Sequence, residues 1–236
     1  AAALSARTVT RIAEVGADAW DACAGNDNPF VSHAFLDSLE QSGSCGTETG
    51  WLPQHLLLED ASGELLGAMP LYLKNHSQGE YVFDHGWADA FERAGGRYYP
   101  KLQCSVPFTP ATGPRLLVPP GPEADARRDS LIAAATQVAE RFGVSSLHVT
   151  FPTEAEWRRF GAAGFLLRTG EQFHWENQGW ADFDEFLAGR LGQTYNDNKR
   201  ETVDTPAVRA LFETGRNGDG YHFQYHLRVN FYDGVR

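Results

Sequence analysis

The most regular pattern of hydrophobic positions predicts a long helix over residues 126–142. Leu131, Ala135 and Val138 recur there at helical spacing, and Gly143 follows as a residue that commonly ends a helix. Shorter apolar faces predict further helices at 17–24, 32–42, 87–94, 154–163 and 182–191.

Strand patterns alternate with these helices. The runs 55–59 and 64–74 predict a hairpin, joined by a turn in which Gly63 supplies a positive φ. Gly67 and Pro70 interrupt the second run, and proline cannot donate to a ladder, so a bulge or an edge is expected there. Further strands are predicted at 10–15, 81–84, 103–106, 115–118, 146–151, 165–168, 172–175 and 221–232.

The order of these elements predicts an α/β (α+β) fold with a mixed, mostly antiparallel sheet and flanking helices. The strands 165–168 and 172–175 are expected to form a second hairpin. Residues 221–232 alternate strictly between apolar and polar side chains, as in a strand with one buried face. Residues 192–220 are polar and rich in glycine.

Composition narrows the function classes. The 236 residues are 42% hydrophobic and 12% aromatic, which is enough for a core and argues against general disorder. The net charge of −11 repels phosphate backbones, so general nucleic-acid binding is disfavoured. No run approaches the roughly 20 apolar residues that cross a bilayer, and no secretion signal is recognised. Three widely spaced cysteines argue against a disulfide framework and favour a reducing cytoplasm.

No metal site is expected. His222 and His226 are four residues apart on a predicted strand, which separates them by about 13 Å. One zinc ion cannot bridge that distance, and no HExxH motif occurs.

Several stretches resemble a known family. Residues 115–175 resemble the second half of a GNAT-type acyltransferase domain: a strand (RLLV), a long helix, a strand (SLHVTF), a short helix that ends in Gly-Phe, and a hairpin. The stretches NPFVSHAFLDSLE, YYPKLQCSVPFTPATGPRLL and GFLLRTGEQFHWEN, followed by DFDEFLA, are more specifically similar to the FemAB-like N-acyltransferases, which are described as peptidoglycan biosynthesis or recognition proteins. The resemblance covers about residues 26–190.

This resemblance implies a GNAT-like acyltransferase domain over residues 1–190. Family members resemble two tandem GNAT-like halves, and this chain is too short for both. The family also tends to carry many Arg and Lys residues after the DFDEFLA-type helix, whereas GRLGQTYNDNKRETVD follows here. Residues 191–236 are therefore expected to be an atypical C-terminal segment, with a remnant of a second half as one explanation.

The resemblance implies acyl-CoA or an aminoacyl-tRNA as the acyl donor. GNAT enzymes that use acyl-CoA bind its pyrophosphate on backbone N–H groups at the start of the long helix. Residues 120–125 occupy that place and include two prolines without an N–H and two acidic side chains, which predicts poor anion binding. The net charge gives no independent support for tRNA.

His174 and Asp84 are the candidate catalytic residues. His174 belongs to the hairpin that, in a GNAT-like sheet, lies beside the acceptor groove, where a neutral imidazole can accept a proton from an amine. Asp84 precedes His85 in a glycine-containing turn and can orient that imidazole. The alternatives are that His174 is hydrogen-bonded for packing alone and that Asp84 caps the next helical turn.

Candidate substrate-binding residues surround these two. Two tyrosines and two basic residues bracket a proline-rich loop, and phenols with fixed cations suit an acidic or sugar-phosphate ligand. Alternatively, this loop is a rigid surface loop whose tyrosine rings cover the core. The candidate substrate-binding residues are Trp87, Tyr98, Tyr99, Lys101, Arg115 and Gln172.

These observations predict a cytoplasmic N-acyltransferase that transfers an acyl or aminoacyl group to an amine, carried by a small molecule or a peptidoglycan precursor. The prediction requires a groove lined by residues 84–115 and 165–175. The alternative is a non-catalytic ligand-recognition module on the same scaffold, which the poor cofactor loop and the atypical C-terminal segment favour. No pattern indicates an oligomeric state.

Overall fold

The computed structural model describes residues 4–169, 179, 181–182, 184–185 and 228–232. The chain divides into two compact units, one of residues 1–172 and 225–236 and one of residues 173–224. All named helices and strands belong to the first unit: β1 (Ser5–Val9), α1 (Ala17–Ala24), α2 (His33–Gln41), β2 (Trp51–Pro53), β3 (His55–Glu59), β4 (Leu65–Met69), β5 (Leu71–Lys74), α3 (His85–Arg93), β6 (Lys101–Cys104), α4 (Ala124–Phe142), β7 (Leu147–Thr150), α5 (Glu154–Ala162), β8 (Leu166–Thr169) and β9 (Arg228–Tyr232).

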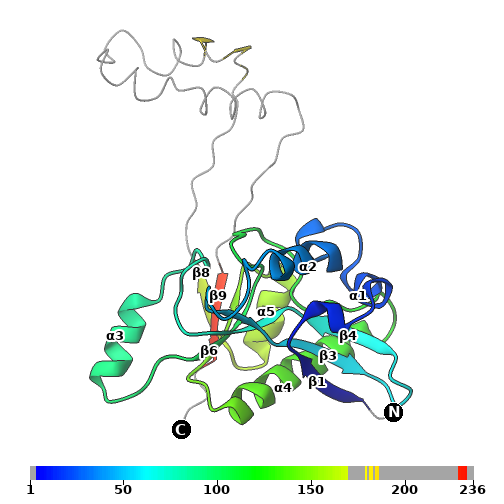
Figure 1. Cartoon of the computed structure of the whole chain (residues 1–236), viewed down its shortest axis with the longest axis horizontal. Helices are drawn as coiled ribbons and strands as arrows, with labels where there is room; N and C mark the ends of the chain where they lie inside the picture. The colour runs from blue at the N-terminus through cyan, green and yellow to red at the C-terminus, as the bar shows by residue number, and fades with distance from the viewer. Residues whose placement is uncertain (1–3, 170–178, 180, 183, 186–227, 233–236) are drawn as a thin grey trace. The chain divides into compact units, whose positions relative to one another are not determined.

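The strands form two sheets (Figure 1). One has the order β1-β3-β4 and is antiparallel throughout. The other has the order β2-β5-β6-β7-β9-β8, and all of its neighbours are antiparallel except the parallel pair β6 and β7. The expected fold, a mixed and mostly antiparallel sheet with flanking helices, is confirmed.

Pro70 divides the strand that was expected over 64–74. Residues on its two sides form β4 in the smaller sheet and β5 in the larger one. A proline lacks the N–H that a continuous ladder needs, so the chain changes sheets at this residue. The expected bulge lies nearby, as a register shift between Leu58 and Glu59 in the pairing of β3 with β4.

Helix α4 packs its apolar face on one side of the larger sheet. Leu131 and Ala135 belong to the main core together with Leu102 of β6 and Leu147 of β7. The helix ends where expected, because Gly143 adopts a left-handed conformation with φ 60°. Since side chains alternate along a strand, the neighbours of Leu102 and Leu147 point to the opposite face of the sheet.

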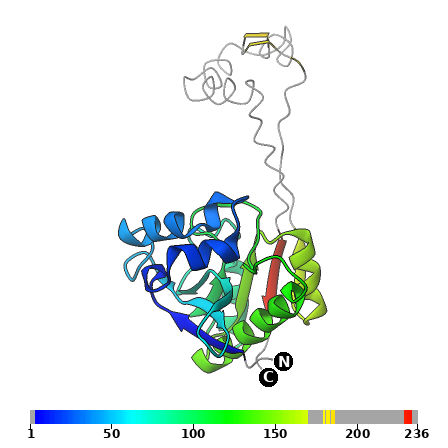
Figure 2. The ribbon, with the colours of Figure 1, turned by 90° about the vertical axis from the view of Figure 1, so that its right-hand side faces the viewer.

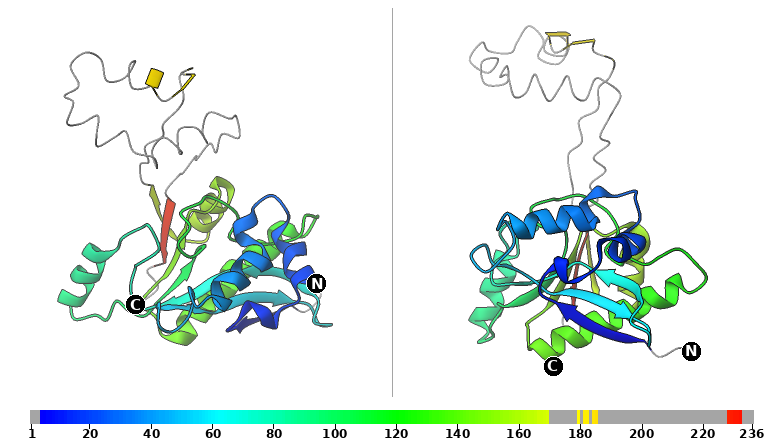
Figure 3. Two further views of the ribbon diagram at one scale, coloured as in Figure 1. Left: turned by 45° about the horizontal axis from the view of Figure 1, so that its top comes forward. Right: turned by 45° about the vertical axis from the view of Figure 1, so that its right-hand side comes forward.

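A second core lies between the smaller sheet and the N-terminal helices. It includes Trp20 of α1, Leu36 of α2 and Leu57 of β3. Figure 2 shows α1 and α2 on the side of the fold away from α5. Helix α3 projects at the opposite end of the fold from α1 (Figures 1 and 3).

Several predicted strands differ from the structure. The first strand is Ser5–Val9 rather than 10–15, because its polar sequence SARTV gives little apolar signal and pairing with β3 stabilises it. Residues 81–84 form no strand, since Tyr81 has a φ of 57° that no strand accommodates. Residues 115–118 make only an isolated bridge, between Leu117 and Ala68.

The C-terminal part of the chain contributes a strand to the larger sheet. Residues 228–232, from the segment expected to be atypical, form β9 between β7 and β8. The expected hairpin partner of β8, residues 172–175, lies outside the described residues, and the expected boundary at residue 190 stays a prediction. None of the helices in the described part of the chain has the length and apolar character that crossing a bilayer requires.

Candidate functional site

The face of the larger sheet that points away from α4 carries polar side chains on its central strands. Lys74 and Lys101 lie opposite each other on β5 and β6, and Gln103 of β6 lies beside His148 of β7. Thr150 follows on β7, and its hydroxyl accepts a hydrogen bond from Gln103 Nε2 at 3.0 Å. All five side chains are buried, although polar residues this deep are uncommon.

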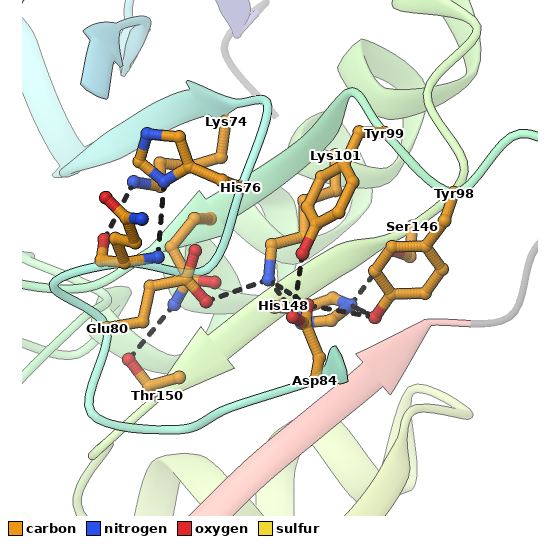
Figure 4. A network of polar contacts seen from close by, with 12 residues as sticks. Lys74, His76, Glu80, Asp84, Tyr98, Tyr99, Lys101, Ser146, His148 and Thr150 are labelled. Carbon is orange, nitrogen blue, oxygen red and sulfur yellow. Dashed lines mark hydrogen bonds and ion pairs between the residues drawn. The ribbon is translucent and has the colours of Figure 1, made fainter. Parts of the chain in front are cut away.

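The segment 75–100, which joins β5 to β6, covers this polar face and supplies two carboxylates (Figure 4). Lys101 Nζ lies 2.8 Å from Glu80 Oε2 and 2.5 Å from Asp84 Oδ2. Tyr99 donates its hydroxyl to Asp84 Oδ1 at 2.8 Å, and Tyr98 donates to Asp84 Oδ2 at 3.0 Å. These residues form a buried cluster in which one lysine holds two acidic groups.

His148 completes this cluster from the strand beneath. Its Nδ1 lies 3.3 Å from Lys101 Nζ, and its Nε2 lies 2.9 Å from Ser146 Oγ. A lysine ammonium has only donors, so Nδ1 accepts and Nε2 carries the proton. Burial, and then the neighbouring Lys101, lower the pKa of His148 well below its usual value. The imidazole is therefore neutral near pH 7.

The two carboxyl groups of the cluster differ in proton affinity. Burial raises the pKa of Glu80 to about 7, and the attraction of Lys101 only partly opposes that rise. Burial alone would also raise the pKa of Asp84, but Lys101 and the hydroxyl of Tyr99 outweigh it and hold that pKa at about 2. Carboxyl groups whose pKa values are driven apart in this way are typical of catalytic sites.

Glu80 also keeps one oxygen available. Its Oε2 is bound by Lys101, whereas Oε1 is buried and has no hydrogen-bond partner among the described residues. A buried acceptor without a donor is costly and uncommon in native proteins. Glu80 therefore combines a raised pKa with a buried oxygen that has no hydrogen-bond partner among the described residues.

Three bulky residues near Glu80 and Thr150 have a strained backbone conformation. Tyr81, Phe108 and Phe151 have φ values of 57°, 56° and 53°, which bulky residues rarely adopt. Tyr81 directly follows Glu80, Phe151 directly follows Thr150, and the backbone N–H of Phe108 donates to the carbonyl of Gly79 at 3.1 Å. Strain of this kind persists where surrounding structure enforces it, which is common at functional sites.

The structure brings together four of the residues that the sequence singled out. Asp84, Tyr98, Tyr99 and Lys101 meet in the buried cluster. Trp87 lies nearby in α3 with 55% of its surface exposed, and the guanidinium of Arg168 is 5.8 Å from its ring centre. His174 and Gln172 lie outside the described residues, so their expected place beside the groove stays a prediction.

Arg115 requires a correction. Its side chain is fully buried and donates to the backbone carbonyls of Thr150, Pro114 and Ala111 at 2.8–3.0 Å. A guanidinium engaged in this way holds the proline-rich loop against the end of β7 and is not presented to a ligand.

Sequence reasoning missed two members of the cluster, Glu80 and His148, and also Gln103 beside His148 on the polar face. A signal was present in KLQC and LHVT, the sequences of β6 and β7, which alternate polar and apolar residues. Alternation of this kind usually indicates a solvated face, so it did not indicate that the polar face is covered.

The start of α4 does not fit the diphosphate of a CoA donor. The preceding turn contains Pro120 and Pro122, which have no N–H to offer an anion. Glu123 at the N-cap and Asp125 in the first turn place two exposed carboxylates there, which pair with Arg127 at 2.8 Å and with Arg128 at 2.9 Å. The expected poor binding of a diphosphate at this helix stays a prediction.

The described residues contain no group of three or more His, Cys, Asp or Glu side chains arranged to hold a metal ion.

Among solved structures, the chain resembles a GNAT family N-acetyltransferase (YhbS) from Escherichia coli in complex with CoA, with a TM-score of 0.41, 17% identity, and coverage of 70% of each chain. It also resembles the Drosophila melanogaster polyamine N-acetyltransferase that forms N-acetylagmatine, with a TM-score of 0.41, 15% identity, and coverage of 75% of this chain and 91% of that one. Similarities at this level assign neither a substrate nor a cofactor to this chain.

No curated protein matches the chain. A family model does match residues 11–225, which is most of its length. The chain therefore belongs to the FemAB-like family, which is described by peptidoglycan biosynthesis or recognition.

Proposed function

We propose that this protein is an N-acyltransferase and that its amine acceptor reacts at the buried cluster on the polar face of β5, β6 and β7. The observation that carries the proposal is Glu80, which has one oxygen fixed by Lys101, one oxygen without a partner among the described residues, and a pKa raised by burial to about 7. A carboxyl group of this kind is suited to accept a proton from an amine near neutral pH.

In the proposed reaction, the amine enters as an ammonium and gives one proton to the Glu80 carboxylate. The freed lone pair attacks the carbonyl carbon of the acyl donor, so that a C–N bond forms and the carbonyl electrons move to oxygen. The tetrahedral intermediate then collapses, the bond to the leaving group breaks, and the leaving group takes the second proton lost by nitrogen. The products are an amide and the protonated leaving group, and Glu80 returns its proton to solvent.

Asp84 has a different part in this proposal. Because its pKa is held at about 2, it is a weak proton acceptor near neutral pH. We assign it a positioning role: Tyr98 and Tyr99 orient Asp84, which fixes Lys101, which in turn fixes Glu80. The catalytic role that the sequence suggested for Asp84 is thus moved to Glu80, and His174 stays a candidate for a second base.

We infer that the acceptor is the amine of a small molecule or of a cell-wall precursor, in keeping with the family description. The poor fit of the α4 start to a diphosphate favours an acyl or aminoacyl donor bound elsewhere on the chain. Cys23, Cys45 and Cys104 are all free and buried, which supports the expected reducing compartment.

A non-catalytic recognition module is the second candidate. The specific observation in its favour is that Lys101 forms ion pairs with both Glu80 and Asp84 and that all three residues are at most 3% exposed. A cluster of this kind can stabilise a fold without turning over a substrate.

The test is amide formation by the full chain. The protein is incubated with agmatine or a lysine dipeptide and with one of three donors: acetyl-CoA, S-acetyl-N-acetylcysteamine, or aminoacyl-tRNA. Mass spectrometry then detects the acylated amine. We expect amide from the aminoacyl ester or from the small thioester, with acetyl-CoA no better than the small thioester. Absence of amide with every donor, while the amine still binds, would establish the recognition module instead.

A further inference from the structure

The segment of residues 75–97 lies over the polar face with its charged groups toward the sheet and aromatic rings toward solvent. Glu80 and Asp84 point to the sheet and are at most 3% exposed (Figure 4). Tyr81, Phe83 and Trp87 are 50%, 66% and 55% exposed. Burial of apolar surface is what usually holds a segment on a sheet, and burial of charge opposes it. The position of this segment therefore costs more and returns less than that of a segment with its aromatic side inward.

The three hydrophobic clusters in the described part of the chain contain no residue of segment 75–97. Their members come from residues 9–73 and 102–165. Val82 and Ala88 of the segment are buried, but neither belongs to a cluster. Segments with few buried apolar contacts open at a lower free energy than the core does. We therefore expect this segment to separate from the sheet before β6 and β7 unfold.

Polar contacts with two lysines hold the segment on the sheet. Lys101 Nζ forms ion pairs with Glu80 and Asp84. Lys74 Nζ donates a hydrogen bond to the carbonyl of Gln78 at 3.1 Å. Because removing two charges from water costs about as much as their pairing returns, a buried ion pair adds little net stability. These contacts fix where the segment lies without making it costly to lift.

Both ends of the segment are suited to a movement of the whole segment. At its start, Lys74 belongs to β5, which is paired with β6. At its end, Gly95 and Gly96 follow α3, and Gly95 has a φ of 86° with open space at its Cβ position. Beyond these glycines the chain is fixed again, since Ser145 N donates to the carbonyl of Pro100 at 3.2 Å. Glycine adopts many backbone conformations, which suits a hinge between two fixed parts.

We propose that residues 75–97 form a lid that opens as one unit from the polar face of β5, β6 and β7 while the rest of the fold stays intact. The inference rests on the proposed function and deepens it, because it states how substrates reach a cluster that the closed protein buries. Substrates enter the open protein, and closure returns Glu80 to Lys101. Closure of this kind excludes water and completes a catalytic site.

Three native side chains report separately on the lid and on the core. Lys74 and Lys101 are buried under the lid, whereas Cys104 is buried in the main core. The full chain is treated with formaldehyde and cyanoborohydride, which methylate amines, or with iodoacetamide, which alkylates thiols. Mass spectrometry gives the rate at each residue. The protection of a residue is its rate in the urea-unfolded chain divided by its rate in the native protein.

We expect both lysines to be less protected than Cys104 by about tenfold or more, because the lid opens more often than the core unfolds. Equal protection of the lysines and Cys104 would show that the lysines become accessible only through global unfolding. That result would overturn the proposal.

Tyr99→Phe tests whether the lid moves as one unit. It removes the hydroxyl that donates to Asp84 Oδ1 and changes no charge. We expect the protection of Lys74 and Lys101 to fall equally, by about tenfold, although no hydrogen bond or ion pair of the described structure joins Lys74 to either residue. Tyr81→Phe removes an exposed hydroxyl of the lid and should match the wild type. A fall at Lys101 alone, or at neither lysine, would overturn the proposal.

Ile132→Val tests the independence of the lid from the core. Ile132 of α4 belongs to the same cluster as Cys104, and the lost methylene should lower the protection of Cys104 about fivefold. We expect Lys74 and Lys101 to keep their wild-type protection, because α4 stays packed when the lid opens. A parallel fall at the lysines would contradict a separate lid.

These measurements need no substrate, so they separate this inference from the proposed function. If an amide forms and the lysines are as protected as Cys104, the reaction stands and the lid is wrong. If the lysines react before Cys104 and no donor yields an amide, the lid stands and the acyl transfer is wrong.

Discussion

Lys74 of β5 and Lys101 of β6 lie directly opposite each other in the larger sheet, and neither side chain reaches solvent. Like charges in this position destabilise a sheet. Lys74 is accommodated by the ring of Trp51, 3.7 Å from its Nζ, and by the carbonyl of Gln78 at 3.1 Å, and burial lowers its pKa to about 8. Lys101 instead depends on two carboxylates. Burying these two lysines costs free energy that apolar side chains at the same positions would not cost.

The first prediction concerns the dependence of the fold on Lys101. Replacing it in Lys101→Met leaves Glu80 and Asp84 buried without their shared cation. We expect the free energy of unfolding to fall by about 3–5 kcal/mol, as measured for other buried pairs that lose one partner. Urea denaturation of the full chain measures this loss.

Arg7→Met is the control for that measurement. Arg7 pairs with Glu59 at 2.8 Å, but about half of the Arg7 side chain is exposed, so its loss should cost less than about 1 kcal/mol. Equal losses in the two variants would show that the buried cluster contributes no more than a surface ion pair.

The second prediction concerns stability between pH 4.5 and about 7. The folded state raises the pKa of Glu80 from 4.5 to about 7, so the folded state binds its proton more tightly than the unfolded state does. The stabilisation is complete below pH 4.5 and is lost as the pH rises toward 7. We expect the wild type to lose stability relative to Glu80→Gln across this range. His148 acts in the opposite direction, and taking the difference between the two proteins removes its contribution.

The third prediction concerns the stability of the folded protein at acidic pH. Asp84 has a folded pKa of about 2 against an ordinary value of 3.8, so its stabilising contribution is present above pH 3.8 and is lost as the pH falls toward 2. Asp84→Asn should flatten this part of the stability curve in urea denaturation. A wild-type curve that is already flat between these values would contradict the ion pair.

The fourth prediction separates Arg115 from the site. Arg115→Lys cannot reproduce a guanidinium that donates to three carbonyls in different directions. We expect it to lower the free energy of unfolding by about 2–4 kcal/mol while kcat/KM for acylation of a primary amine by the folded fraction stays unchanged. Weaker amine binding at full stability would restore the ligand-binding role that the sequence suggested.

The fifth prediction concerns Trp87, whose exposed ring lies at the start of α3. Trp87→Ala should change the free energy of unfolding by less than about 1 kcal/mol, because little apolar surface is lost from the core. If the ring contacts the acceptor, KM for a bulky amine rises while KM for methylamine stays constant. Equal KM values for both amines in the variant would remove Trp87 from the substrate-binding residues.

Much of the fold was predictable because strong local signals agree with it. The apolar spacing in 126–142 and the glycine at 143 define α4, and the short apolar run in 55–59 defines β3. Pro70 was correctly read as an interruption, but a single sequence does not reveal that the chain changes sheets there. β1 was misplaced because its pairing with β3, a contact distant in sequence, outweighs its weak local pattern.

The candidate site was only partly predictable. Asp84, Tyr98, Tyr99 and Lys101 were found because a short, aromatic and charged stretch contains them all. Glu80 was missed because the acidic residue itself has no local signature; its role depends on being folded over Lys101. Gln103 and His148 belong to strands 40 residues or more apart along the chain, which only the parallel pairing of β6 and β7 brings together.

The most direct test of the account is the kcat/KM for acylation of a primary amine by Glu80→Gln, compared with Glu64→Gln, an exposed glutamate in the turn before β4. Loss of a general base typically lowers rates by 10²–10⁴-fold. The account predicts a fall of about 10²-fold or more for Glu80→Gln, at unchanged secondary structure, and wild-type kcat/KM for Glu64→Gln. Wild-type kcat/KM in a folded Glu80→Gln variant would contradict it.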